Sequence, residues 1–198
     1  MTSGLTERER AKADRQSALL HEAARLFAER GYSGVSLEEL GASVGVSGPA
    51  VYRHFANKQA LLGTILVTVS ERLRAGGQAV VAAEGGADEQ LRALVRFHVD
   101  FALTDADVIR VQDRDLASLS ADDRHTVRRL QRAYVELWIG VLAELHPSRD
   151  PADLRVRAHG CFGLMNSTPY SVQNMRETAD ADAVRGILES MAVAALSA

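Results

Sequence analysis

The sequence has one cysteine and no long apolar run, and each shortage excludes a class of protein. With Cys161 alone the chain cannot form an internal disulfide, which fits a reducing compartment. The longest apolar runs, such as AVVAA at residues 79–83, are far too short to cross a bilayer. Acidic residues lie among the first ten and no apolar segment accompanies them, so no signal peptide is expected. We therefore expect a cytoplasmic protein.

The charge balance gives only weak evidence about partners. The 198 residues are 46% hydrophobic and 25% charged, which suffices for one or two domains with a real core. The net charge is −3. Residues 1–58 carry 8 Lys and Arg against 7 Asp and Glu, and the remainder carries 15 against 19. Any binding of nucleic acid must therefore depend on local geometry. Residues 1–14 form an N-terminal arm that either extends the first helix as a solvated segment or reaches a DNA minor groove.

Helical periodicity runs through the chain and no strand alternation competes with it, which predicts an all-α fold of about nine helices. The first helix should end at Gly31, and a long fourth helix from about residue 62 should fray towards Gly76 and Gly77. Residues 83–87 should form a loop, and Asp105 should cap a sixth helix. Ser120, with an acid three residues later, should cap the seventh. Helices over residues 150–166 and 181–195 should complete the chain.

Residues 36–58 have the spacing of a helix-turn-helix followed by a third helix. Ser36 and Glu39 form a capping box at the start of the first of these helices. Gly45 supplies the backbone freedom to turn the chain, and Ser47 should cap the second helix. That second helix should cover about residues 48–55, with Val51 and Phe55, four positions apart, facing inward.

The exposed face of this second helix has residues suited to DNA. Pro49 and Ala50 are apolar and, beside Gly48, would allow close approach to base edges and thymine methyl groups. Tyr52 and His54 offer donors at phosphate height. Lys58 follows Asn57, a good N-cap, so a cation and a helix N-terminus should form an anion site there. The alternative is a small helical bundle with a solvated face.

The stretch from Ala23 to Leu66 closely resembles the DNA-binding domain of the tetracycline-repressor (TetR) family of bacterial regulators. The matching positions are Ala24, Phe27, Gly31, Tyr32, Ser36, Gly45, Val46, Ser47, Tyr52, His54, Phe55, Lys58 and Leu61. The resemblance implies a homodimeric helical regulator, usually a repressor, that a small ligand releases from its operator. It places Ser36, Ser47, Tyr52, His54 and Lys58 at phosphate-contacting positions and Gly48, Pro49 and Ala50 at base-contacting positions. Because those three carry no hydrogen-bonding side chain, operator choice should depend on methyl contacts, backbone and DNA shape.

We expect residues 1–60 to form the DNA-binding domain and residues 61–198 a ligand-binding and dimerisation domain. Polar or aromatic groups within apolar stripes are the candidate ligand contacts, or else satisfied groups of the core. The candidates are His98, Phe101, Gln112, Tyr134, Trp138, Phe162 and Asn166. Pro169 should break or kink the eighth helix and expose polar groups towards a pocket.

The effector should be apolar or amphipathic, with a fatty acid or an acyl thioester of coenzyme A as candidates. An apolar cavity beside a cationic rim would suit such an anion, although the same arginines could pair with nearby aspartates on a solvated surface. The arginines are Arg110, Arg114, Arg128, Arg129 and Arg132.

Dimerisation should use the last two long helices. Leu188, Met191 and Ala195 repeat at helical spacing, as do Ala158, Cys161 and Met165, while Gly160, Gly163 and Gly186 would allow close approach.

An enzyme is not expected. Residues 45–49 lack the last glycine of a nucleophile elbow, and no glycine-rich phosphate loop is present. Isolated pairs such as His159 and Cys161 do not make a metal site, and no cofactor is indicated. The competing function is a helical DNA-binding or adaptor protein without a small-molecule effector.

Overall fold

The computed structural model describes residues 7–46, 48–83, 85–173 and 180–198; for residues 8–15, 48, 50 and 168–173 it describes the backbone only. Over these ranges the chain forms nine α-helices, two short 3-10 helices and no strand, which confirms the all-α expectation. Within them, no helix combines the length and apolarity needed to cross a membrane. The elements are α1 (Glu7–Arg30), η1 (Tyr32–Gly34), α2 (Leu37–Ser43), α3 (Gly48–His54), α4 (Lys58–Ala83), α5 (Ala87–Thr104), α6 (Ala106–Asp115), η2 (Leu116–Ser118), α7 (Ala121–Leu145), α8 (Pro151–Gln173) and α9 (Ala181–Ser197).

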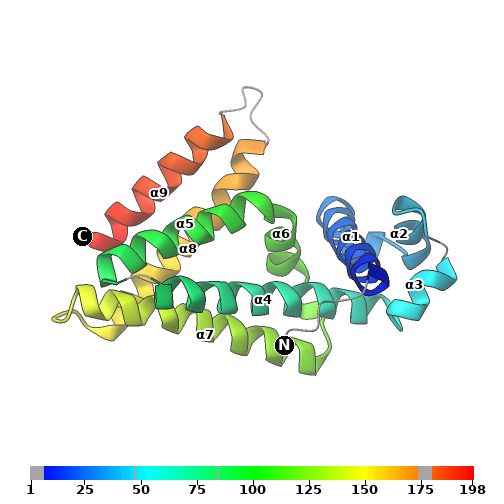
Figure 1. Ribbon diagram of the computed structural model, residues 1–198, viewed down its shortest axis with the longest axis horizontal. Helices are drawn as coiled ribbons and strands as arrows, with labels where there is room; N and C mark the ends of the chain where they lie inside the picture. The colour runs from blue at the N-terminus through cyan, green and yellow to red at the C-terminus, as the bar shows by residue number, and fades with distance from the viewer. Residues whose placement is uncertain (1–6, 47, 84, 174–179) are drawn as a thin grey trace.

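The helices form a small unit and a larger body joined by α4 (Figure 1). Helices α1 to α3 gather at one end, and α4 runs from them along the molecule beside α7. Helices α5, α8 and α9 pack at the other end, and α6 stands between α1 and the rest.

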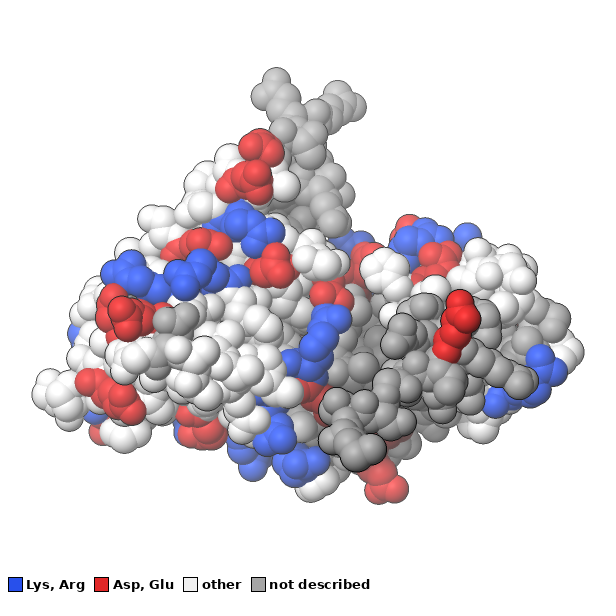
Figure 2. Space-filling model, in the orientation of Figure 1, with Lys and Arg blue, Asp and Glu red and all other residues white. Residues whose placement is uncertain are grey.

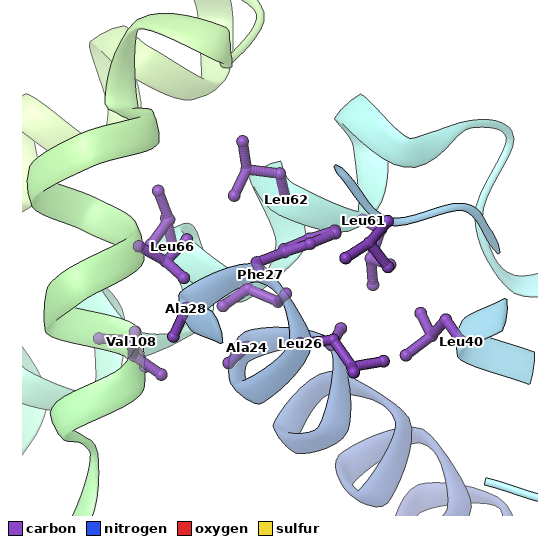
Figure 3. Close-up of a cluster of buried hydrophobic side chains, with 14 of the residues drawn as sticks. Ala24, Leu26, Phe27, Ala28, Leu40, Leu61, Leu62, Leu66 and Val108 are labelled. Carbon is purple, nitrogen blue, oxygen red and sulfur yellow. The ribbon is translucent and has the colours of Figure 1, made fainter. Parts of the chain in front are cut away.

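One hydrophobic cluster supports α1 to α3 and reaches beyond them (Figure 3). Phe27 of α1, fully buried, lies among Leu61, Leu62 and Leu66 of α4, and Val108 of α6 belongs to the same cluster. Burying such side chains contributes about 1.5–3 kcal/mol each. The unit at this end therefore shares its core with α4 and α6.

A second cluster holds the body together. Trp138 and Leu142 of α7 are fully buried there, together with Leu91 of α5 and residues of α8 and α9. The outward face is different, because Val156, Ile187 and Met191 have exposed fractions of 71%, 57% and 50%.

The expected fraying of α4 at Gly76 and Gly77 is wrong, because the helix continues to Ala83. The two glycines serve packing instead. A Cβ at Gly76 would lie 2.4 Å from the ring of Phe97, and one at Gly77 would lie 2.6 Å from the ring of Tyr134. Without side chains at these positions, α5 and α7 approach α4 closely.

The helix caps were predicted with mixed success. Ser36 and Ser120 each accept a hydrogen bond from the backbone N–H three residues later, as expected. Asp105 occupies the N-cap position of α6 but its side chain makes no capping bond. Its carboxylate pairs with Arg72 at 2.6 Å instead, because α4 passes beside it.

Helix α8 runs from Pro151 to Gln173, so the expected break at Pro169 is wrong, while the alternative, a kink, stays a prediction. A proline removes one helical hydrogen bond, and the neighbouring bonds can persist when the helix is otherwise well packed. Before the proline, Ala158, Cys161 and Met165 pack α8 inside the subunit.

The same burial corrects the expected dimer contacts. Ala158, Cys161, Met165 and Leu188 are at most 4% exposed within a single subunit, so they cannot contact a second copy. Met191 and Ala195 are exposed.

Candidate DNA-binding surface and effector cavity

The turn between α2 and α3 has the backbone that the sequence requires. Ser36 accepts the Glu39 N–H at 3.1 Å, and the Glu39 carboxylate accepts the Ser36 N–H at 2.8 Å, so both halves of the capping box are present. Gly45 has φ +70°, a conformation that few side chains tolerate. The Val46 N–H donates to the Gly41 carbonyl at 2.9 Å and closes α2.

One face of helix α3 is buried and the opposite face is exposed. Val51 and Phe55 are 0% and 4% exposed, as predicted, and they fix the helix on the first cluster. Tyr52 is 49% exposed, and Arg53 and His54 are exposed beside it. Basic side chains reach the surface at this end of the molecule (Figure 2).

The base-facing candidates can be placed only in part. Pro49 is exposed, while Gly48 and Ala50 are described by backbone alone. Ser47 lies outside the described residues.

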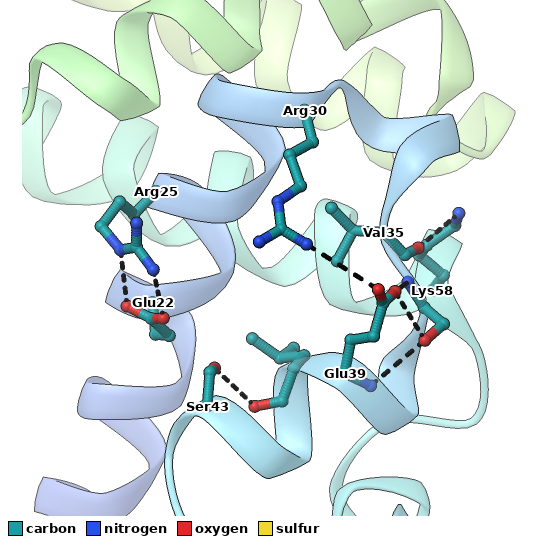
Figure 4. A network of polar contacts seen from close by, with 9 residues as sticks. Glu22, Arg25, Arg30, Val35, Glu39, Ser43 and Lys58 are labelled. Atoms are coloured by element: carbon teal, nitrogen blue, oxygen red, sulfur yellow. Dashed lines mark hydrogen bonds and ion pairs between the residues drawn. The ribbon is translucent and has the colours of Figure 1, made fainter.

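Lys58, at the start of α4, contacts η1 and the residue that follows it (Figure 4). Its Nζ donates to the Val35 carbonyl at 2.8 Å and lies 4.7 Å from the centre of the Tyr32 ring. Asn57 caps α4, because its Oδ1 accepts the Ala60 N–H at 2.8 Å. Lys58 is thus the first residue of α4, where anions are favoured, and its ammonium fixes the connection between α1 and α2.

Other predicted phosphate contacts are partnered within the chain. The Tyr52 hydroxyl donates to the Glu38 carboxylate at 2.9 Å, which raises the pKa of that phenol. The Ser36 hydroxyl donates to the Glu39 carboxylate at 2.9 Å. A phosphate would have to replace or share these partners.

The body contains a partly open cavity of about 230 Å³ between α4, α5, α6, α7 and α8. Its apolar lining consists of Leu73, Phe101, Val108, Ile109, Val135 and Phe162. Its polar lining consists of Ser70, His98, Gln112, Gln131, Tyr134, His159 and Asn166.

A line of hydrogen bonds crosses one wall of this cavity. The His98 Nδ1 lies 3.2 Å from the Tyr134 hydroxyl, and its Nε2 lies 3.0 Å from the Asn166 Oδ1. The ring of His98 also lies 4.9 Å from that of Phe162, centre to centre. Helices α5, α7 and α8 are therefore joined through one buried imidazole.

Burial sets the protonation of this wall. Desolvation lowers the pKa of His98 to about 4, although the bond to Asn166 works in the opposite direction. Burial also raises the pKa of the Tyr134 phenol well above its ordinary value. Both groups are therefore neutral at physiological pH.

Six of the seven predicted ligand contacts line this single cavity: His98, Phe101, Gln112, Tyr134, Phe162 and Asn166. Trp138 does not line it, because its ring is fully buried behind that wall. Within the described chain the Trp138 indole N–H has no partner of hydrogen-bonding geometry. It lies near the Tyr134 phenol and acts to lower the pKa of that group, against the larger effect of burial.

The sequence missed several lining residues. Ser70 faces the cavity from α4, its hydroxyl donating to the Leu66 carbonyl at 2.7 Å, and Gln131 faces it from α7. Gln131 lies three residues before Tyr134 on one helical face, a signal that was available. His159 gave the same kind of signal, because it lies three residues before Phe162, itself a predicted contact, on α8.

The predicted arginine cluster does not line the cavity. Arg114 instead contacts the Asp115 carboxylate and donates to the carbonyls of Phe27 and Ala28 near the end of α1. Arg128, Arg129 and Arg132 are exposed on α7.

Helix α6 consequently connects the two ends of the molecule. Val108, Ile109 and Gln112 face the cavity from it, while Arg114 near its last turn binds the carbonyls of α1. A cation at those carbonyls complements the negative end of the α1 dipole.

A helix-turn-helix with an exposed second helix, joined to a helical body with a cavity, is the architecture of a DNA-binding transcriptional regulator. Two family models agree with it. The model for bacterial regulatory proteins of the tetR family matches residues 19–65, and the model for the tetracyclin repressor-like C-terminal domain matches residues 84–170. The chain belongs to the TetR family of bacterial regulators.

The curated relatives include a repressor and an activator. The transcriptional repressor KstR2 of Rhodococcus jostii is 28% identical over 132 residues, which is 66% of this chain and 65% of that protein. The regulator CymR of Pseudomonas putida is 29% identical over 153 residues, 75% of this chain and 74% of the relative. The activator FasR of Mycolicibacterium smegmatis is 30% identical over 98 residues, 50% of this chain and 45% of the relative. The chain thus spans slightly less than two thirds of the first relative.

Solved structures share the fold. A TetR-family regulator from Bordetella parapertussis superposes with a TM-score of 0.77 at 22% identity, covering 89% of this chain and 93% of that one. AibR in complex with isovaleryl coenzyme A and operator DNA gives 0.72 at 23% identity, covering 89% and 97%. FadR from Bacillus subtilis in complex with stearoyl-CoA gives 0.67 at 19% identity, again covering 89% and 97%.

Proposed function

We propose that this regulator binds an inverted-repeat operator as a homodimer and that a small effector in the cavity releases it. The observation that carries the proposal is the position of α6, which lines the cavity with three residues and holds α1 through Arg114. A ligand that displaces α6 would therefore move the end of α1 and the helix-turn-helix packed on it. Binding must favour the displaced state, since equal affinity for both states would shift nothing.

The outer faces of α8 and α9 support dimerisation. Val156, Ile187 and Met191 expose apolar side chains there, and Gly160 and Gly163 have open space where a Cβ would project. An exposed apolar face on two adjacent helices fits a two-fold four-helix interface. We expect a dimer by light scattering at micromolar concentration, and Ile187→Glu should shift it towards monomer.

The division at residue 60 is part of the same proposal, with residues 1–60 as the DNA-binding domain and residues 61–198 as the effector-binding and dimerisation domain. The first cluster supports a core around Phe27 of α1, and this core also includes residues of α4 and α6 beyond residue 60. Leu61 and Leu62 lie beyond the division but pack on Phe27, so the start of α4 completes the core of the DNA-binding domain.

The effector should be largely apolar, and acyl thioesters of coenzyme A and fatty acids are the classes to test first. Two structural neighbours, AibR and FadR, are complexes with acyl derivatives of coenzyme A. The apolar share of the cavity lining here suits an acyl group.

DNA binding is tested by fluorescence anisotropy on fragments from the region around the gene of this protein. Two recognition helices should enter successive major grooves about 34–36 Å apart, so the protected site should be an inverted repeat. Arg53→Gln should weaken binding and lower the slope of log K against log salt by about 0.9 if Arg53 neutralises one phosphate. A helical adaptor without DNA function would show no salt-dependent binding.

Tyr52→Phe and Lys58→Met test the predicted phosphate contacts. Tyr52→Phe removes one hydroxyl and leaves the ring, and it should weaken all DNA sequences alike. Lys58→Met should do the same and lower the salt slope. Arg129→Gln, on exposed α7, is the matched control for charge. Unchanged affinity in both Tyr52→Phe and Lys58→Met would contradict the assignment.

A further inference from the structure

The cavity has no charged side chain in its described lining. Its described residues include no Lys, Arg, Asp or Glu, and His98 and Tyr134 are neutral for the reasons given above. The other titratable residue, His159, is exposed on α8. A carboxylate or ammonium drawn inside would lose its hydration without gaining a counter-charge. The seated part of an effector must therefore be uncharged.

The hydrogen bonds across the wall have one direction. The Asn166 Oδ1 can only accept, so the Nε2–H of neutral His98 donates to it at 3.0 Å. The Nδ1 of the same ring then accepts from the Tyr134 hydroxyl at 3.2 Å. This order leaves the Asn166 amide N–H groups, which have no partner among the described residues, as the donors that the wall presents to the cavity. Successive bonds of one direction also polarise one another and strengthen the last donor.

The volume limits the ligand. An apolar cavity of about 150 Å³ accommodates benzene, so about 230 Å³ accommodates a group of about ten non-hydrogen atoms. Phe101, Val108 and Phe162 supply the apolar surface around such a group. An acyl chain longer than this would extend beyond the cavity.

We propose that the effector carries an uncharged carbonyl group on a short apolar body of about ten non-hydrogen atoms or fewer. The carbonyl group lies in the cavity, and its oxygen accepts a hydrogen bond from an N–H of Asn166. This inference rests on the proposed effector function and narrows it. It selects an acyl thioester, ester, amide or ketone and excludes the free fatty acid, because a carboxylate would enter a cavity without a cation. In a thioester of coenzyme A, the charged nucleotide stays outside while the acyl carbonyl enters.

The test compares ligands of one chain length by isothermal titration calorimetry on the full-length protein. The probes are methyl hexanoate, hexanoyl-CoA, hexanoate and coenzyme A alone. Methyl hexanoate and hexanoyl-CoA should bind at least tenfold more tightly than hexanoate. The ester and the thioester distinguish a free carbonyl compound from a coenzyme A derivative as the source of the group. Binding of hexanoate as tight as the ester, or no binding of either carbonyl compound, would overturn the proposal.

Asn166→Asp isolates the donor, because it keeps an oxygen for His98 and removes the amide N–H groups. It should weaken methyl hexanoate at least tenfold, while Ser167→Ala, exposed on the next residue of α8, should leave binding unchanged. Asn166→Leu, which adds no charge, should weaken it similarly, and circular dichroism checks that both variants fold. Ester affinity unchanged in both Asn166 variants would refute the assigned contact.

Operator release by the same ligands separates the two proposals. If hexanoate binds and releases DNA, the carbonyl inference fails and the regulator function stands. If the ester binds through Asn166 without releasing DNA, the inference stands and the effector role fails.

Discussion

Replacing Gly77 by alanine should destabilise the protein, although alanine is the better helix former. Gly77 lies within α4, is buried, and faces α7. A Cβ there would lie 2.6 Å from Tyr134 Cε2 and 3.0 Å from Leu137 Cδ2. The ring of Tyr134 cannot withdraw freely, because its hydroxyl is bonded to His98 at 3.2 Å and its face stacks on that imidazole.

The magnitude follows from two opposing effects. Overpacking of a well-filled interior costs about 1–3 kcal/mol. Alanine in place of glycine within a helix returns about 1 kcal/mol. The net expectation for Gly77→Ala is a loss of about 1 kcal/mol of unfolding free energy, which lowers Tm by about 2–4 °C in a chain of this length. Because Tyr134 also lines the cavity, its displacement would change the cavity wall.

Gly140→Ala is the matched control. Gly140 lies within α7, is exposed, and has no heavy atom within 4 Å of a built Cβ, so the helix gain stands alone. It should raise Tm by about 2–4 °C, from a gain of about 1 kcal/mol. Thermal unfolding of both variants at one fixed protein concentration measures the difference, since the proposed dimerisation would make Tm depend on concentration. Equal increases for the two variants would refute the packing argument.

Three further changes test other parts of the structure. His98 has a pKa of about 4 in the folded state and 6.5 in the unfolded state. The free energy of unfolding is therefore fully retained above pH 6.5 and decreases as the pH falls towards 4, because the unfolded state binds the proton first. Urea titrations of the wild type should lose up to about 1.4 kcal/mol per pH unit in this window, and His98→Gln should show a shallower dependence; equal slopes would contradict this account. Ser36→Ala removes the N-cap of α2 and should cost about 1 kcal/mol in the same titration, whereas no loss would mean that the capping box adds nothing. Arg114→Ala should leave operator affinity within about threefold, an estimate that assumes no DNA contact by Arg114, but blunt the release by effector in anisotropy assays; a full response would exclude this route.

The helix-turn-helix could be predicted in detail because its signals are local. A capping box, a glycine with positive φ and two inward residues four positions apart define it without reference to the rest of the chain. Six of the thirteen residues that line the cavity were predicted, because a polar residue such as His98 within an apolar stripe must find partners across the core.

The errors arose where distant helices decide the outcome. Gly76 and Gly77 suggest a helix end in isolation, but the rings of Phe97 and Tyr134 need the space that they leave. Pro169 suggests a break, but α8 continues to Gln173. For Cys161 the helical repeat gave the stripe correctly, but not whether it faces its own subunit or another.

The shared core of α1, α4 and α6 limits how this regulator can be recombined with others. A hybrid that took residues 1–60 from another member of the family would place a foreign α1 against the native Leu66 and Val108. It would also present different backbone carbonyls to Arg114. Such a hybrid would need α6 from the same donor as α1. The reason is that α6 both packs on α1 and lines the cavity, so it has to fit the two parts of the molecule at once.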